Sequence, residues 1–313
     1  MRAMTSAVFA SILVATTTIP LVRAPAQASR TGPRRAAPAE TAIILLGTGG
    51  PPPNPDAFGP ATAITVGHRV FIIDAGAGIT RRMRSAGLPM TGITALFVTH
   101  LHSDHTLGYP DLMLTSWVMG RTRPIAVFGP PGIRDMTDHI LAAWSEDIDI
   151  RVHGLEHRPP SYGVDVHEVQ PGVVYDEGGV RVTAFPVQHG NWKYSYGYRF
   201  DTPDRSIVIS GDTRPSESLV AAARGCDVLV HEAHHAGVAP PPNAPGGASW
   251  QKYMHEFHTS DVELGAIAAR VQPKLLILTH VGRVGATDAD LIAGVRKGGF
   301  TGRVAVGRDL DRY

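Results

Sequence analysis

Three histidines and one aspartate lie close together in the segment His100-Leu101-His102-Ser103-Asp104-His105. Imidazole nitrogens and carboxylate oxygens are common ligands of divalent metal ions. In extended backbone, His100 and His102 point to the same side, whereas Asp104 and His105 follow in a loop and can face a second point. Four such groups would be costly to bury without partners, so the alternative to a metal site is a solvated surface loop. The spacing suits two adjacent metal ions better than one.

The elements around this segment predict a sheet with one functional edge. The apolar run Ala95–Thr99 precedes the segment, and its length and its Phe and Val content indicate a buried strand. Other apolar runs end in the same way, in a residue that can bind a metal ion or transfer a proton. The residues at these strand ends are His100, His189, Asp212, Glu232 and His280. We therefore expect an α/β fold with one site assembled from across the chain.

The number of candidate ligands also predicts a dinuclear centre. The candidates are His100, His102, Asp104, His105, His189, Asp212 and His280. They are too many for one tetrahedral zinc ion, and they suit two borderline-soft divalent ions, most simply zinc. A carboxylate such as Asp212 can bridge two ions that clamp the attacking and leaving oxygens of a displacement. A bridging water then becomes hydroxide near neutral pH and serves as the nucleophile.

The His-x-His-x-Asp-His pattern and the later strand-end residues resemble the metallo-β-lactamase superfamily. This resemblance implies a single-domain αββα sandwich, in which two mixed sheets are flanked by helices. The implied ligands of one ion are His100, His102 and His189, and those of the other are Asp104, His105 and His280, with Asp212 shared. The resemblance also implies that Asp74 braces the metal-binding loop through hydrogen bonds and does not bind metal.

Three further motifs resemble the ribonuclease Z-like branch of that superfamily. They are Gly211-Asp212-Thr213-Arg214-Pro215, His231-Glu232-Ala233 and His258-Thr259-Ser260. Enzymes of this branch cleave phosphodiesters, and close relatives cleave sulfate esters. The resemblance implies that His258, oriented by Glu232, stabilises or protonates the leaving group, which a histidine paired with a carboxylate can do. Asp104, His258 and Glu232 are therefore the predicted catalytic residues; the alternative is that His258 only starts a helix and Glu232 only caps one.

The chain departs from ribonuclease Z in two respects. That enzyme carries a long Gly-rich, basic arm that grips tRNA before the Gly-Asp-Thr-Arg-Pro motif, whereas here only Asp201–Ser210 lies in that interval. The formal net charge is +1, from 29 basic and 28 acidic residues, which gives no general attraction to nucleic acid. We therefore expect an exported hydrolase of small phosphodiesters or sulfate esters, with nucleic acid disfavoured as a partner. The alternatives are a ribonuclease Z-type tRNA 3′-processing endonuclease, a lactonase-type metallo-hydrolase or β-lactamase, and a metal-dependent binding protein without catalysis.

The amino terminus predicts export. Arg2 supplies a positive charge, residues 7–19 are apolar, and Ala26-Gln27-Ala28 resembles a signal-peptidase site. We expect a signal peptide at residues 1–28, a flexible lead-in at 29–40 and one hydrolase domain at 41–313. The apolar run is short for a bilayer-spanning helix, so no stable membrane anchor is expected in the periplasmic or extracellular protein. A homodimer is left open.

Periodicity predicts several other elements. Thr106–Trp117 is expected to be one helix, and Ser260 with Glu263 forms a capping box that opens a helix ending at Val271. Thr287 is the expected N-cap of the last helix. Residues 147–178 show little periodicity, and no element is predicted there. The lone cysteine, Cys226, is interpreted as a small buried residue.

Overall fold

The computed structural model describes residues 40–236, 249–283 and 285–313. The strands of these residues form two β-sheets. The order in the first sheet is β1 (Thr41–Gly47), β2 (Ala61–Val66), β3 (Arg69–Ile73), β4 (Ile93–Phe97), β5 (Ile125–Gly129) and β6 (Val164–Glu168). The order in the second is β13 (Arg303–Val306), β12 (Leu275–Gly282), β11 (Val228–His234), β10 (Ser206–Ile209), β9 (Tyr196–Asp201), β8 (Val180–Pro186) and β7 (Gly172–Glu177). Both sheets contain parallel and antiparallel pairs, which confirms two mixed sheets.

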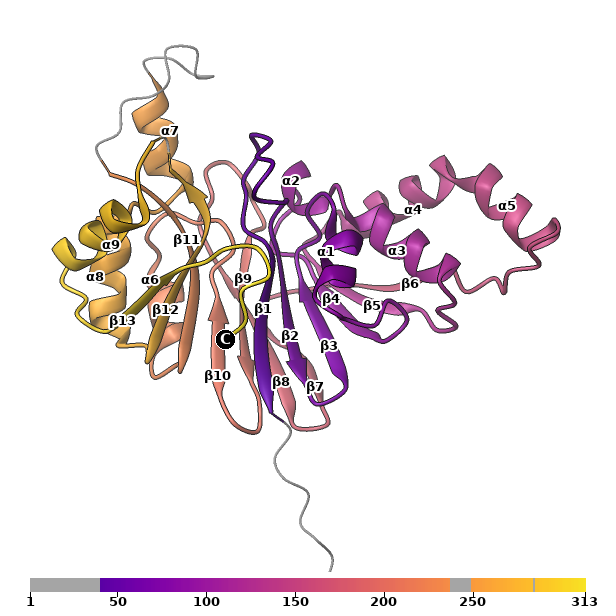
Figure 1. The fold of residues 1–313 in the computed structure, drawn as a ribbon, viewed down its shortest axis with the longest axis horizontal. Helices are drawn as coiled ribbons and strands as arrows, with labels where there is room; N and C mark the ends of the chain where they lie inside the picture. The colour runs from indigo at the N-terminus through magenta and orange to yellow at the C-terminus, as the bar shows by residue number, and fades with distance from the viewer. Residues whose placement is uncertain (1–39, 237–248, 284) are drawn as a thin grey trace, which may run out of the picture. The chain divides into compact units, whose positions relative to one another are not determined.

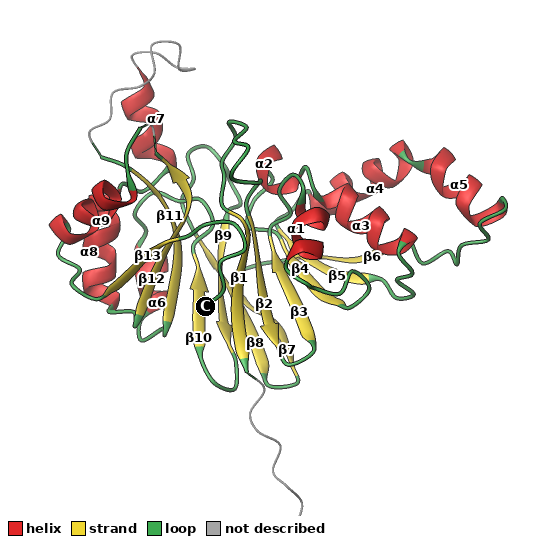
Figure 2. Cartoon of the chain, in the orientation of Figure 1, coloured by secondary structure: helices red, strands yellow, loops and turns green. Residues whose placement is uncertain are grey.

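The two sheets pack face to face, and helices cover their outer faces (Figure 1; Figure 2). Buried residues of both sheets, such as Phe97 of β4 and Phe200 of β9, share one core in which their ring centroids lie 5.3 Å apart. The first sheet is covered by α1 (Ile79–Ser85), α3 (Tyr109–Val118) and α4 (Ile133–Ala143). The second is covered by α6 (Glu217–Ala223), α8 (Asp261–Val271) and α9 (Asp288–Lys297). The expected αββα sandwich is confirmed.

The helix expected over Thr106–Trp117 is broken, and this part of the prediction is wrong. A short helix, α2 (Ser103–Thr106), ends before Leu107, and α3 begins at Tyr109. Between them the Gly108 amide donates a hydrogen bond to the Ala75 carbonyl at 2.8 Å. A Cβ at Gly108 would lie 2.1 Å from the Gly76 carbonyl oxygen, so only glycine allows this approach. The break separates α2, which belongs to the ligand turn at residues 100–105, from α3, which packs on the sheet.

Other predicted elements are confirmed, and some elements have no counterpart in the prediction. Ser260 and Thr287 both form capping boxes, at the starts of α8 and α9, and Cys226 is buried. The weakly periodic stretch 147–178 contains most of α5 (Ser145–His153) and all of β6 and β7. A further helix, α7 (Trp250–Phe257), has no counterpart in the prediction either.

A carboxylate near the end of the chain fixes the loop that follows β1. Asp309 accepts hydrogen bonds from the amide and hydroxyl of Thr48 at 2.9 and 2.8 Å, and from the amide of Phe58 at 2.9 Å. Within this loop, a Cβ at Gly50 would lie 3.3 Å from the ring of His280. The loop therefore lies against one of the predicted metal ligands.

The predicted signal peptide and nearly all of the lead-in lie outside the described residues, so export stays a prediction. Within the described ranges, no helix combines the length and apolar character needed to cross a bilayer.

Candidate metal centre

All seven predicted ligands come together at one edge of the two sheets, in two groups. Their donor atoms lie within 4.8 Å of one another in each group. The first group contains His100, His102, His189 and Asp212, and the second contains Asp104, His105 and His280. His100, His189 and Asp212 follow strands β4, β8 and β10, as expected.

His280 does not end its strand, and its position has a local cause. β12 continues to Gly282 and pairs with β11, but Glu232 pairs with Thr279 and Ala233 with Val281, so His280 is bulged out of the ladder. Its φ is +48°, in the left-handed region that few non-glycine residues adopt. A bulge re-aims a side chain, and here it turns His280 to the centre.

Three imidazole nitrogens of the first group converge on one point. His102 Nδ1 lies 2.9 Å from His100 Nε2 and 3.1 Å from His189 Nε2. Hydrogen bonds to fixed acceptors determine which nitrogen is free. His189 Nδ1–H donates to the Phe257 carbonyl at 2.7 Å. His100 Nδ1 lies 3.0 Å from the Thr99 hydroxyl. Both Nε2 lone pairs therefore face the shared point, which is the arrangement of metal-binding histidines.

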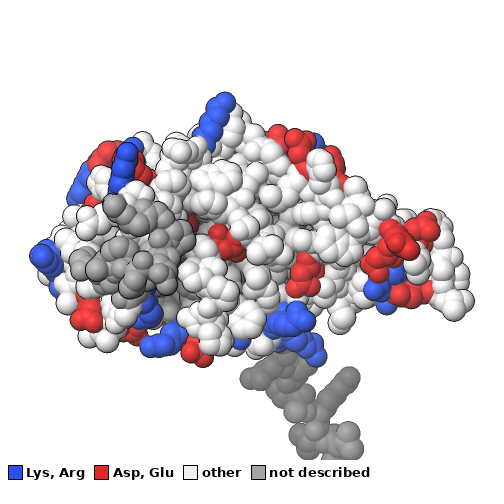
Figure 3. Space-filling view, turned by 90° about the horizontal axis from the view of Figure 1, so that it is seen from above, with Lys and Arg blue, Asp and Glu red and all other residues white. Residues whose placement is uncertain are grey.

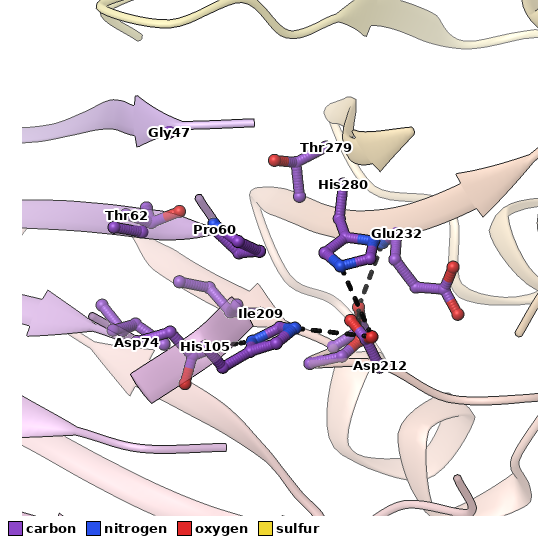
Figure 4. A pocket seen from close by; sticks show the side chains of 14 residues that line it. Gly47, Pro60, Thr62, Asp74, His105, Ile209, Asp212, Glu232, Thr279 and His280 are labelled. Atoms are coloured by element: carbon purple, nitrogen blue, oxygen red, sulfur yellow. Dashed lines mark hydrogen bonds and ion pairs between the residues drawn. The ribbon is translucent and has the colours of Figure 1, made fainter. Parts of the chain in front are cut away.

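The second group surrounds the carboxylate of Asp212, as Figure 4 shows for the rings of His105 and His280. Asp212 Oδ2 lies 3.4 Å from His105 Nε2 and 3.6 Å from His280 Nε2. The same oxygen lies 3.9 Å from His189 Nε2 in the first group. Asp104 Oδ2 lies 3.1 Å from His280 Nε2. Asp212 thus stands between the two groups, in the position of a shared ligand.

Asp74 braces the ligand turn as the resemblance implied. Its carboxylate accepts hydrogen bonds from the Thr99 amide at 2.8 Å and the Thr99 hydroxyl at 2.9 Å. It also accepts from His105 Nδ1–H at 2.8 Å, which leaves His105 Nε2 free. Within the described residues, His105 Nε2 is buried without a hydrogen-bond partner. A buried nitrogen aimed at two carboxylates fits a metal ion, so the residues present can hold two divalent ions.

Burial and charge shift the pKa values of these groups in opposite directions. Burial lowers the pKa of His189 to about 4 and that of His100 well below its usual value, so both are neutral and able to bind metal. Burial also opposes protonation of His105, but the carboxylates of Asp212 and Asp74 raise its pKa well above the usual range. A metal ion binding at His105 Nε2 must therefore displace a proton.

Glu232 and His258 form the predicted pair beside the first group. Glu232 Oε1 accepts from His258 Nδ1–H at 3.2 Å and from the amides of Thr213 and Thr259 at 3.2 and 3.1 Å. The His258 ring lies 5.3 Å from that of His189. His258 follows α7 and does not start a helix. Although burial opposes it, Glu232 raises the pKa of His258 to about 9, so the imidazole carries a proton at neutral pH.

Trp192 belongs to the site but has no counterpart among the predicted residues. Its indole Nε1 lies 2.8 Å from His102 Nε2, and the two rings pack with centroids 4.8 Å apart. A lone tryptophan in a loop gives no signal in the sequence; only its nearness to His189 indicates a role. Four other histidines lie far from the centre in exposed or surface contacts: His139, His153, His157 and His167.

The chain is similar in sequence and fold to known proteins. The model of the beta-lactamase superfamily domain matches residues 69–281. Ribonuclease Z of Mycobacterium marinum is 36% identical over 276 residues, covering 86% of this chain and 97% of the relative. Ribonuclease Z of Mycobacterium bovis is 34% identical over 276 residues, covering 86% and 96%. Human tRNase Z, short form, has a TM-score of 0.65 at 23% identity, covering 87% of this chain and 98% of that structure. The last likeness concerns the fold alone.

These relatives contradict the expected hydrolysis of small phosphodiesters or sulfate esters and the expectation that nucleic acid is disfavoured as a partner, but they do not test export. That expectation relied on the missing arm between β9 and β10, where Asp201 pairs directly with Ser206. The Mycobacterium marinum relative matches along 97% of its own length, which leaves no room for a long arm that this chain lacks. The absence of an arm therefore does not separate this chain from proteins named ribonuclease Z.

Proposed function

The chain belongs to the beta-lactamase superfamily, and from that premise we propose that it is a ribonuclease Z-type endonuclease that cleaves a phosphodiester bond at the 3′ end of tRNA precursors. The observation that carries the proposal is the contact between His258 and Glu232, 3.2 Å long, beside the first ligand group. A poor leaving group, such as a ribose oxygen, needs this proton donor. The two most similar of the relatives compared above support the choice of phosphodiester and of RNA.

The donor set fits two zinc ions. The first group offers three imidazole nitrogens and one carboxylate, and the second offers two imidazoles with Asp104 and the shared Asp212. Such mixed nitrogen and oxygen sets suit zinc better than magnesium or calcium, which prefer oxygen ligands. Bound there, two divalent ions would lower the pKa of a water and stabilise negative charge on the phosphate.

The chain's own side chains supply the remaining functions. His258 holds its Nδ1 toward Glu232, so its Nε2–H is the proton that passes to the leaving oxygen as the phosphorus–oxygen bond breaks. Glu232 fixes the ring orientation and stabilises the imidazolium, because it is itself held by the amides of Thr213 and Thr259. Asp104 completes the second ligand group, where its Oδ2 lies 3.1 Å from His280 Nε2.

The test is cleavage of a precursor tRNA with a 3′ trailer by the zinc-loaded protein, with the ends of both products mapped. The expected result is single cleavage at the 3′ end of the tRNA, slowed about 100- to 10,000-fold in His258→Ala. Added metal should not restore the rate of that variant. Full metal occupancy without cleavage of any precursor would overturn the proposal.

A further inference from the structure

An aromatic face of α7 adjoins the candidate centre. Trp250, Tyr253 and Phe257 are spaced so that they lie on one side of the helix. The rings of Tyr253 and Phe257 are stacked with centroids 4.6 Å apart, and those of Trp250 and Tyr253 lie 5.8 Å apart. We call these three residues the α7 aromatic face.

This face is continuous with both the metal ligands and the proton donor. The Phe257 ring lies 5.1 Å from the His189 ring, and Gly190 leaves the space that the Phe257 ring occupies. The Tyr253 ring lies 5.7 Å from the His258 ring. Burial raises the pKa of the Tyr253 hydroxyl, and the carboxylates of Asp212 and Asp104 raise it further. Tyr253 is therefore within reach of the charges at the centre.

The α7 aromatic face is also accessible. None of the residues of α7 is buried, and Tyr253 is 37% exposed. In the view of Figure 3, outside the grey atoms, the surface is mostly uncharged, with Lys and Arg side chains in small groups toward its margin. Stacking of bases on exposed aromatic rings adds binding that does not depend on phosphate contacts.

We propose that Tyr253 of the α7 aromatic face stacks against a base of the RNA substrate. The base belongs to the nucleotide that keeps the leaving oxygen after the phosphorus–oxygen bond breaks. The assignment rests on the proposed function, because it requires an RNA substrate. It follows from the position of Tyr253 next to His258: the nucleotide whose oxygen receives the proton must lie on that side of the phosphate. Stacking tolerates any base, since every base has an aromatic face. The site would thus prefer an unpaired nucleotide at the cleavage position.

The experiment is a double-mutant cycle between protein and RNA, using the zinc-loaded protein. One precursor tRNA is normal, and the other carries an abasic ribose at the nucleotide that keeps the leaving oxygen. Wild-type protein should lose about 5- to 150-fold in kcat/KM on removal of the base. In Tyr253→Ala that penalty should shrink to about twofold or less, and Tyr253→Phe, which keeps the ring, should restore it.

Trp144→Ala is the matched control, because Trp144 is a 41% exposed aromatic residue at the start of α5, outside the site. It should show the full wild-type penalty. Metal content is measured for every variant. If Tyr253→Ala loses the same factor in kcat/KM on both precursors, removal of the base costs as much as in the wild type. That result overturns the stacking assignment while leaving the proposed function intact. Failure of wild-type protein to cleave the normal precursor overturns the proposed function itself.

Discussion

Oδ2 of Asp212 lies 3.4 Å from Nε2 of His105. His105 carries a proton there in the absence of metal, because Asp212 and Asp74 hold it against the cost of burial. The carboxylate and the imidazole are thus paired with each other until a metal ion replaces the proton. Metal binding and proton release are therefore coupled at this centre.

Replacing Asp212 by Ala should remove the ligand shared by both groups. We expect metal content to fall from two ions per chain to one or none, with a loss of activity beyond the roughly 10- to 100-fold typical of losing an outer partner. Elemental analysis after dialysis against a weak chelator measures this. Two retained ions would show that Asp212 does not bridge.

Replacing Asp74 by Asn tests the brace without disturbing the backbone, since asparagine tolerates the φ of +60° at this position. An amide cannot accept from the Thr99 amide, the Thr99 hydroxyl and His105 Nδ1–H in the way the carboxylate does. Metal affinity should fall about 10- to 100-fold. Competition with a chromogenic chelator checks it. Asp111→Asn is the control, because the Asp111 carboxylate accepts hydrogen bonds from the Thr80 and Thr115 hydroxyls and not from a metal ligand. This variant should bind metal normally.

Replacing His258 by Ala should keep both metal ions and slow turnover about 100- to 10,000-fold, because the leaving oxygen loses its proton donor. The loss should be smallest for a substrate whose leaving group needs no proton, such as a nitrophenyl phosphodiester. Glu232→Gln should fall between wild type and His258→Ala. Normal turnover of His258→Ala on a poor leaving group would contradict the assigned role.

The stability of the fold should decrease in acid partly through Asp227. Partial burial opposes ionisation, but Lys274 at 2.5 Å and the Ser206 amide at 2.7 Å hold the pKa of Asp227 below its usual value. A lowered pKa in the folded state stabilises it above the unfolded pKa, and that stability is lost as pH falls through the folded value. Urea denaturation between pH 7 and pH 3 should show a smaller decrease for Asp227→Asn, by less than about 1 kcal/mol, because Lys274 is 82% exposed and the ion pair is screened by solvent. Parallel curves for both proteins would exclude this contribution.

How far the sequence reveals this structure depends on the range of the interactions. The ligand set could be predicted because its members lie at or just after apolar runs that are visible locally, although β12 itself continues past His280. α5, β6 and β7 could not, because their residues are largely exposed and lack an apolar period. The acceptor of His189 is a carbonyl 68 positions away, and nothing in the sequence indicates such a contact. The substrate prediction was wrong because the missing arm between β9 and β10 does not separate this chain from proteins named ribonuclease Z. The signal peptide stays a prediction, which the mass of the mature protein would test.

Asp309 joins the loop at Thr48 across 261 positions of sequence. A growing chain therefore has its first strand long before it has the carboxylate that fixes the loop beside His280. His280 itself is also made late, after the ligand turn at residues 100–105. During synthesis the ligands at residues 100–105 are therefore present before His280, which completes the second group. The full complement of two metal ions can therefore bind only after His280 has been made.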